Sequence, residues 1–466
     1  MDATARADRI VADRLRAAAD REPLPGPATG ADAVAIASSI GAGSPHADRF
    51  TAEVAAAVRG TALALEAARP HPTDLWAAAA AEHPDPSVWF EQAVLLGHPV
   101  HPLARSRGAL TDAEIRAYAP EHRARIDLGR YGFARRATNQ PDAGTEVPPV
   151  PVHPWQARRR GLGAPDRVWA GAAPLMSLRT VATGRWHVKT AVDLQLTSAV
   201  RHVSAASIRN GAALAARLAD PAKRTGIALL PETALWALAE GPRGDDGPDL
   251  AVAATADGPP DPGLSALVRP APHVVGHPRA VPLAALAVRC PSDGRPIAVA
   301  FTGDDPASWW EAFVAVALAP LRLFADTGVA LEAHGQNTLA SFTGDRPTSL
   351  VYRDFGGVRV PPGDWPDLVG DLPEPDPEKR LVKLLAALFP TTLTSIVDAF
   401  ADWSGTDPGK WWSAVAAEVQ GMGLESWIAA AVLRDPWPLK ATTAMRLADN
   451  PVDDIWIRVD NLLAAA

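Results

Sequence analysis

The sequence predicts an α+β protein in which a sheet-bearing middle lies between two mainly helical ends. Three observations predict it. Helical patterns occur at residues 3–20, 47–68 and 75–82. Residues 186–196 alternate apolar and polar side chains, as a half-buried strand does. Residues 380–463 are again largely helical in pattern. Helices and strands that gather in separate runs are typical of the α+β class.

The element boundaries have local causes. The first helix ends before Pro23, because proline cannot continue a helix. Thr111 and Glu114 form a Thr-x-x-Glu capping box, which predicts a helix start. Four prolines between residues 148 and 154 predict an extended stretch. The Pro-, Gly- and Asp-rich segments 240–263 and 361–378 predict exposed loops.

Further strands and a helix are predicted in the middle of the chain. Residues 175–183 are rich in strand-forming side chains, and residues 208–218 return to a helical pattern. In the strand expected at 186–196, Lys189 and Gln195 share one face, opposite the face of Trp186 and Leu196. Two or three subdomains are expected for 466 residues.

Composition excludes several classes of protein. The net charge of -8 argues against a general nucleic-acid binder, which needs a basic face. The one cysteine, Cys290, rules out a disulfide framework within the chain and a multi-cysteine metal site. The charged, Ala-rich start is unlike a signal peptide. No apolar run approaches the roughly 20 residues of a membrane span. We therefore expect a cytoplasmic protein that binds neither membrane nor nucleic acid.

The first candidate site is the loop at residues 97–108, with the sequence GHPVHPLARSRG. It offers His101, Arg105 and Arg107 within a short, proline-flanked stretch. Guanidinium groups match phosphate oxygens through parallel N–H donors, so one interpretation is a nucleotide-phosphate loop. A Pro-rich connector with solvated arginines is the alternative, and a zinc site would need a ligand from far away.

Two more clusters could hold a metal–nucleotide complex. Ser177, Arg179 and Lys189 could gather on one sheet face, with Arg201 beyond them, as a hydroxyl and cations for a triphosphate. Outward charges on a half-exposed strand are the alternative. The stretch LEAHGQNT at 331–338 and RDFGG at 353–357 combine carboxylates, a histidine and amides, which suits Mg²⁺ and nucleotide. A turn with capping polar groups would look similar.

The sequence carries no Walker loop, no G-x-S-x-G elbow and no H-E-x-x-H. The motifs that it does carry, in order, resemble those of the IucA/IucC family of siderophore synthetases that work independently of nonribosomal peptide synthetases. They are GHPxHP at 97–102, PVHPWQ at 151–156, SLRT at 177–180 with Lys189, Thr197 and Arg201 downstream, EAHGQN at 332–337, RDFGG at 353–357, and KATTAMRL at 440–447 with Asn450 and Pro451.

The resemblance implies a cupped-hand fold of thumb, fingers and palm. The corresponding regions here are a shortened helical thumb at 1–90, sheet-bearing fingers at 91–270, and a mixed palm with a helical end at 271–466. It also implies an AMP-forming acid–amine ligase. Such an enzyme adenylates citrate or a related polycarboxylic acid and then joins it to an amine or hydroxyl. The cofactors would be ATP and Mg²⁺, and a homodimer is what the resemblance suggests.

The resemblance assigns roles to individual residues. Lys189, Arg201 and His334 would be catalytic. Thr197, Arg201 and His334 would hold the acid, and Glu332 and Asp354 would hold Mg²⁺. The expected ATP ligands are His101, Arg105, Arg107, Ser177, Arg179, Thr180, Lys189, Gln336 and Asn337. Arg105 stands where the family usually has lysine, and the two are not equivalent at a phosphate.

Two alternatives share this site. One is an adenylating ligase of the same fold in a pathway that does not make siderophores. The other is a noncatalytic homologue that binds the nucleotide or the acid. Acid-dependent pyrophosphate release distinguishes a ligase from the noncatalytic homologue, and the identity of the acid distinguishes the pathways.

Overall fold

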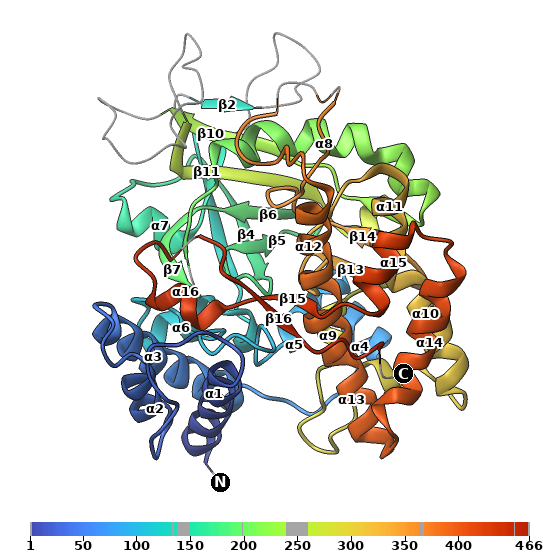
Figure 1. The fold of residues 1–466 in the computed structure, drawn as a ribbon. Coiled ribbons are helices and arrows are strands. Elements are labelled where there is room, and N and C mark those ends of the chain that lie inside the picture. Colours follow the sequence, from blue (N-terminus) through green and yellow to red (C-terminus); the bar gives the residue numbers. More distant parts are fainter. Residues whose placement is uncertain are drawn as a thin grey trace.

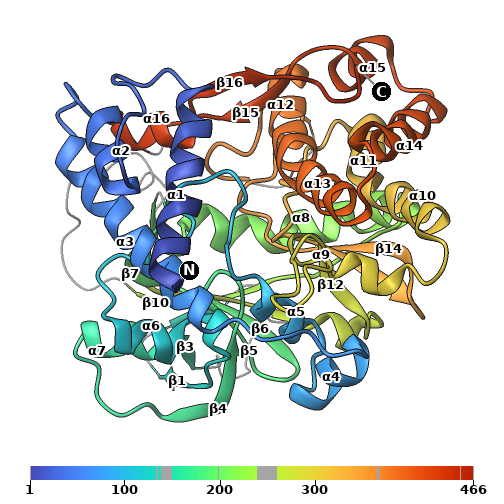
Figure 2. The same ribbon diagram turned by 90° about the horizontal axis from the view of Figure 1, so that it is seen from below.

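A computed structural model describes residues 2–132, 135–137, 149–197, 199–238, 260–363, 365, 368–451 and 453–464. Most of the predicted loop at 240–263 lies outside these residues. The fold is α+β, as predicted: largely antiparallel sheets fill the middle, and helices gather at the two chain ends (Figure 1). The N-terminal helices and most of the C-terminal helices form two groups, which lie below and beside the sheets in Figure 1 and next to each other in Figure 2.

The α-helices in the described part of the chain are α1 Ala3–Ala19, α2 Ala33–Ile40, α3 Ala47–Glu66, α4 Leu75–Glu82, α5 Ser87–Ala93, α6 Asp112–Tyr118, α7 Pro154–Arg159, α8 Ala205–Arg224, α9 Leu283–Leu286, α10 Pro306–Ala317, α11 Ala319–Thr327, α12 Pro377–Ala387, α13 Thr394–Ser404, α14 Pro408–Gly421, α15 Ser426–Leu433 and α16 Thr442–Leu447. The strands are β1 Ile126–Tyr131, β2 Arg135–Ala137, β3 Val150–Val152, β4 Arg167–Pro174, β5 Thr180–Ala182, β6 Trp186–Thr190, β7 Val192–Leu196, β8 Ala199–Arg201, β9 Ile227–Leu229, β10 Thr233–Leu238, β11 Pro260–Pro270, β12 Ala280–Pro282, β13 Thr338–Thr343, β14 Arg346–Tyr352, β15 Trp437–Lys440 and β16 Trp456–Val459.

The predicted helix starts are confirmed closely. The helices expected at 3–20, 47–68 and 75–82 are α1, α3 and α4. The capping box at α6 is present, with the Glu114 backbone N–H donating to Thr111 Oγ1 and the Thr111 N–H donating to the Glu114 carboxylate. Helix α2 was missed, because its sequence AVAIASSI is apolar almost throughout and has no clear polar face.

The large sheet has eight strands in the order β2-β10-β11-β6-β5-β4-β1-β3. A second sheet has the order β12-β13-β14-β9, and β7–β8 forms a separate hairpin. The strand expected at 186–196 is therefore two strands, with a break at Ala191. The predicted half-burial is confirmed in β7, where buried and half-buried residues alternate, but it is wrong for β6, where only Trp186 is exposed and the other residues are buried on both faces.

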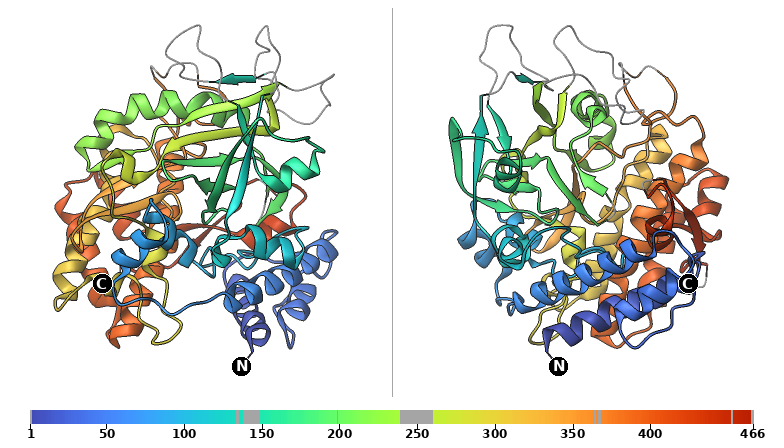
Figure 3. Two further views of the ribbon diagram at one scale, coloured as in Figure 1. Left: turned by 180° about the vertical axis from the view of Figure 1, so that it is seen from behind. Right: turned by 90° about the vertical axis from the view of Figure 1, so that its left-hand side faces the viewer.

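Buried clusters show which segments pack together. The largest joins Leu75, Trp89 and Phe90 of α4 and α5 to residues between 281 and 463. Another joins α1, α2 and α3 to Leu103 and to Leu447 of α16. Both ends of the chain thus share a core with distant segments. Figure 3 shows the arrangement of these segments as ribbons from behind and from the side. The regions predicted at 1–90, 91–270 and 271–466 stay a prediction.

Two helical spans are long and apolar enough to cross a membrane by length and composition. They are Pro306–Thr327 and Pro377–Ser404, with 22 and 28 residues. The expectation that no run approaches this length is wrong, because Pro320 lies in the first turn of α11 and a π-helical turn joins α12 to α13. Within their most apolar windows, 61% and 78% of the residues are buried inside the protein, which is typical of core helices.

Candidate active site

Backbone conformation marks three of the predicted motifs. Among the described residues, four that are not glycine have a left-handed φ, and three of these lie in the motifs: Leu178, Thr197 and Asp354, at 68°, 60° and 76°. Side chains make this conformation costly, by about 1–3 kcal/mol, and residues held in it cluster at functional sites. The surrounding structure must hold these three turns in place.

Lys189 and Asp354 form the central contact between the middle and the C-terminal part of the chain. Lys189 Nζ donates to Asp354 Oδ2 at 2.5 Å, and the two residues are 165 positions apart. Burial lowers the pKa of Lys189. Burial alone would raise the pKa of Asp354, but Lys189 and Arg269 hold it well below its ordinary value. The pair is therefore a lysinium beside a carboxylate.

Arg179 and Arg201 lie beside this pair without a carboxylate of their own. Arg179 Nη1 donates to the backbone carbonyls of Arg201 and His202, at 2.9 and 2.7 Å. Arg201 donates from Nη2 to Thr197 Oγ1 at 2.5 Å and from Nε to a backbone carbonyl at 3.1 Å. Within the described ranges, no carboxylate lies within ion-pair distance of either guanidinium. Two charges held only by neutral acceptors suit an anionic ligand.

The turn between β4 and β5 places the first of these arginines. The Leu178 side chain is fully buried, and its left-handed backbone turns Ser177 and Arg179 to the site side. Ser177 Oγ donates to Thr180 Oγ1 at 2.8 Å, and Thr180 pairs with Lys189 across the strands. Strand pairing therefore brings the SLRT motif and Lys189 together, as predicted.

His101 is buried and has an unused donor. The Leu103 N–H donates to His101 Nδ1 at 3.0 Å, so the neutral ring must carry its proton on Nε2. His101 Nε2 is buried and has no partner among the described residues. Burial, with His98 and Arg201 nearby, keeps the pKa of His101 well below its ordinary value. A neutral N–H donor without a partner is free for a phosphate or carboxylate oxygen.

Arg105 and Arg107 lie in the same loop but have internal partners, which differs from the phosphate contacts expected for them. Arg107 Nη2 donates to both oxygens of Glu121, at 2.6 and 2.8 Å. Arg105 donates to the backbone carbonyls of Val94 and Leu95. Both guanidiniums are almost fully buried, and they lower the pKa of the buried Glu121 to about 2.

The third motif folds as a tight turn next to Asp354. Its residues Glu332, His334, Gln336 and Asn337 lead into β13, and the Asn337 N–H donates to the His334 carbonyl at 2.9 Å. Burial lowers the pKa of His334, although Glu332 and Asp354 both oppose this shift. The Glu332 carboxylate lies 1.9 Å from where a side chain at Gly357 would begin, so Glu332 packs directly against the RDFGG turn.

Sequence reasoning missed the buried charges beneath the site. Glu91 pairs with Arg353, whose guanidinium also donates to the Gln336 carbonyl at 2.8 Å. Arg269 Nη1 donates to Glu232 Oε1 at 3.0 Å. In a third pair, Asp85 contacts His187, which lies on β6 as Lys189 does. These residues are far apart in the sequence, and no spacing relates them, so only the fold could reveal them.

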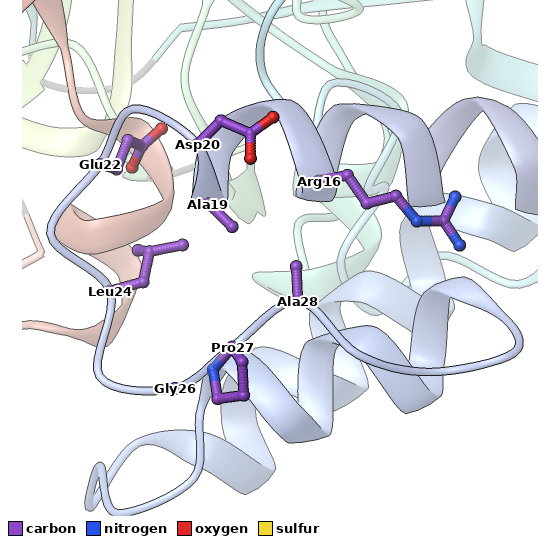
Figure 4. Close-up of a pocket in the computed structure, with 8 residues that line it drawn as sticks. All are labelled: Arg16, Ala19, Asp20, Glu22, Leu24, Gly26, Pro27 and Ala28. Carbon is purple, nitrogen blue, oxygen red and sulfur yellow. The ribbon is translucent and has the colours of Figure 1, made fainter.

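Two hollows in the structure lie away from these residues. One of about 490 Å³ is formed by the end of α1 and the loop after it, with Arg16, Asp20 and Glu22 among its lining (Figure 4). Another of about 710 Å³ adjoins α16. No predicted site residue lines either one. The candidate site thus rests on charge, unused donors and backbone conformation, not on a cavity.

Comparison with known proteins adds independent information. The IucA/IucC family model matches residues 87–143 and 135–288. Staphyloferrin A synthase of Staphylococcus aureus is 25% identical over 327 residues, which is 59% of this chain and 53% of that protein. The rhizobactin siderophore biosynthesis protein RhbC of Rhizobium meliloti is 25% identical over 337 residues, 57% of this chain and 53% of that one. The chain spans about half the length of these curated relatives.

The fold has a solved counterpart. The ATP-bound aerobactin synthetase IucA of Klebsiella pneumoniae superimposes with a TM-score of 0.73 at 19% identity, covering 93% of this chain and 87% of that one. This likeness confirms the predicted fold. A second family model, the ferric iron reductase FhuF-like transporter, matches residues 307–453. That stretch contains no cysteine, so it cannot hold a thiolate-ligated iron cluster.

Proposed function

We propose that this chain, whose residues 87–143 and 135–288 match the IucA/IucC family model, is an AMP-forming ligase that joins a polycarboxylic acid to an amine. The observation that carries the proposal is the pair of guanidiniums without carboxylate partners, Arg179 and Arg201, beside the Lys189–Asp354 pair. A site with this excess of fixed positive charge is suited to a triphosphate and a carboxylate together.

The first step brings two anions together. A carboxylate oxygen of the acid attacks the α-phosphorus of ATP, the bond to the β-phosphate oxygen breaks, and pyrophosphate leaves. Ser177, Arg179, Thr180 and Lys189 hold the triphosphate, and His101 donates its free Nε2–H to it. Gln336 and Asn337 border the nucleotide. Fixed donors that need no reorientation offset the repulsion between the two anions.

The acid lies on the hairpin side of the site. Thr197 Oγ1 and Arg201 Nη2 lie 2.5 Å apart and together form a preorganised binding site for a carboxylate, which we call the acid clamp. His334 is the third group that the resemblance assigns to the acid. In the second step the amine attacks the acyl carbon and loses a proton, and AMP leaves with the oxygen that came from the acid. A neutral His334 is suited to accept that proton, because burial lowers its pKa.

Glu332 and Asp354 fit Mg²⁺. Both carboxylates raise the pKa of His334 and of Tyr352 against or with the effect of burial, so their charges act on the same two neighbours. Mg²⁺ in nucleotide enzymes takes one or two carboxylates, with water and phosphate oxygens as the remaining ligands. The ion would neutralise phosphate charge. Asp354 is shared with Lys189 in this structure, so Glu332 is the carboxylate with more freedom to reach it.

Pyrophosphate release tests the proposal. Purified protein, ATP and Mg²⁺ are incubated with hydroxylamine as a surrogate amine and a panel of di- and tricarboxylates. We expect release that depends on one acid, is lost in Arg201→Gln, and is retained in Arg289→Ala, whose guanidinium pairs with Asp402 on the surface. ATP binding without release for any acid would instead favour a noncatalytic homologue.

A further inference from the structure

We propose that helix α3 sets the spacing between the two halves of the active site, the loop that carries His101 and the β7–β8 hairpin. The positioning residues are Glu53 and Gly60 of α3 and Gln195, the hairpin residue that donates to Glu53. The inference rests on the proposed function only for the names of the two substrates. Its structural basis is a set of contacts through which one N-terminal helix meets both the loop that carries His101 and the hairpin that carries Thr197 and Arg201.

The first contact joins α3 to the hairpin. Gln195 Nε2 donates to Glu53 Oε1 at 2.8 Å, across 142 positions of sequence. Gln195 is two residues before Thr197, at the end of β7. Gln195 has no predicted role in binding or chemistry. Its side chain nevertheless fixes the start of the turn in which Thr197 takes its left-handed conformation.

The second contact makes the Glu53 carboxylate rigid. Arg446 of α16 donates to both Glu53 oxygens, from Nε at 2.9 Å and from Nη2 at 2.5 Å. The Arg446 side chain is 2% exposed. Such a paired geometry orients a carboxylate strongly. Glu53 is thus the shared acceptor of a buried arginine and of the hairpin, and it cannot follow the hairpin if the hairpin moves.

The third contact joins α3 to the histidine loop. Gly60 lies two turns along α3 from Glu53, and a side chain there would begin 2.0 Å from the Arg105 carbonyl oxygen. Helix and loop therefore touch backbone to backbone. The far end of the same loop touches the hairpin, since a side chain at Gly108 would begin 2.7 Å from the Gln195 carbonyl. Helix α3, the histidine loop and the hairpin therefore each contact the other two.

Helix α16 is held by other N-terminal groups that do not reach the site, which provides controls. Glu22 accepts from the Thr443 and Ala444 backbone N–H groups at 2.8 Å each. Arg49 donates to the Arg446 carbonyl at 2.7 Å. Figure 2 shows α16 beside α1, α2 and α3. Removing Glu22 should weaken only the first turn of α16 and leave the Arg446–Glu53 pair and β7 in place.

The experiment compares two test variants and two control variants with the intact protein. Gln195→Ala breaks only the link to the hairpin and leaves the Glu53–Arg446 pair intact. We expect the KM for the acid to rise about tenfold while the KM for ATP and kcat change little, because positioning of the acid clamp is lost. Gly60→Ala pushes on the histidine loop, so the KM for ATP should rise and the KM for the acid should not.

Two variants separate positioning from stability. Ala55→Gly, at an exposed position of α3, weakens the helix by about 1 kcal/mol of intrinsic propensity. Glu22→Gln weakens the α16 contact. Both should lower Tm and leave both KM values unchanged. If Gln195→Ala and Gly60→Ala behave in the same way as these controls, helix α3 has no positioning role.

Hydrogen exchange gives a readout that does not need activity. Amides of the peptide 192–203 should exchange faster in Gln195→Ala than in the intact protein, and at an unchanged rate in Glu22→Gln. Unchanged exchange in Gln195→Ala would overturn the inference. If the intact protein releases no pyrophosphate with any acid, the proposed function fails, whereas the exchange comparison still decides whether α3 holds the hairpin.

Discussion

Two pairs of arginines, both expected to bind ATP or the acid, have opposite surroundings in this protein. Arg105 and Arg107 are buried against Glu121 and backbone carbonyls. Arg179 and Arg201 are bound only by carbonyls and a hydroxyl. Motif position alone does not distinguish these pairs. A carboxylate neighbour does, because a paired guanidinium is already neutralised and an unpaired one still attracts an anion.

The largest expected effect is on activity. Arg201→Gln should lower kcat/KM by about 10²- to 10³-fold, because a fixed charge beside the reacting anions is lost. Its free energy of unfolding should change by less than about 1 kcal/mol, since no carboxylate is left unpaired. Pyrophosphate release and urea unfolding measure the two quantities. A loss of stability without a loss of activity would show that Arg201 has a structural role and does not bind the reacting anions.

Arg107→Gln should give the opposite result. It leaves the Glu121 carboxylate buried with a weakened partner set, so the free energy of unfolding should fall by about 3–5 kcal/mol. The KM for ATP of the folded fraction should change far less than in Arg201→Gln. The double variant Arg107→Gln with Glu121→Gln restores a neutral pair and should regain much of the stability. A double variant no more stable than the single one would contradict this account.

Two buried histidines make the stability of the protein depend on pH. His101 and His153 each accept a backbone N–H at Nδ1 and have a buried Nε2 without a partner. Burial lowers the pKa of His153 to about 3. The unfolded chain, with a pKa near 6.5, then binds a proton that the folded chain does not. His153 therefore costs no stability above about pH 6.5 and costs more as the pH falls towards 3.

The predicted size of this effect is about 2 kcal/mol between pH 6.5 and pH 5, at 1.36 kcal/mol per pH unit. Between pH 6.5 and pH 5, the free energy of unfolding measured in urea should fall by that amount less in His153→Gln than in the intact protein. An equal fall in the free energy of unfolding in the two proteins would mean that His153 is charged in the folded state.

The smallest effect is expected at the surface. Arg289 pairs with Asp402 at 2.7 Å, but the two side chains are 39% and 71% exposed. Arg289→Ala should change the free energy of unfolding by less than about 1 kcal/mol and leave activity unchanged. A larger loss would show that exposure does not separate weak pairs from strong ones in this protein.

The sequence predicted the parts of the fold that have local causes. The capping box at Thr111, the helix end before Pro23 and the α+β order are of this kind. The break at Ala191 could not be predicted, because alternation continues across it and only pairing with β11 and β8 separates the two strands.

The candidate site divides in the same way. The contact between Lys189 and Asp354 joins two motifs that were each found in the sequence. Glu121, which neutralises Arg105 and Arg107, has no sequence signal, since it follows a proline in a short helical turn like many surface carboxylates. Counter-charges come from anywhere in the chain, so the charge state of a motif is a property of the fold.

Oxygen-isotope transfer tests the central claim, carboxylate adenylation, most directly. Once the panel identifies the acid, its carboxylates are labelled with oxygen-18, and the phosphorus products are examined by mass spectrometry after turnover with amine. The account predicts one labelled oxygen in AMP and none in pyrophosphate, because the acid attacks the α-phosphorus. Label in inorganic phosphate, with ADP as the other product, or no label in AMP, would contradict it.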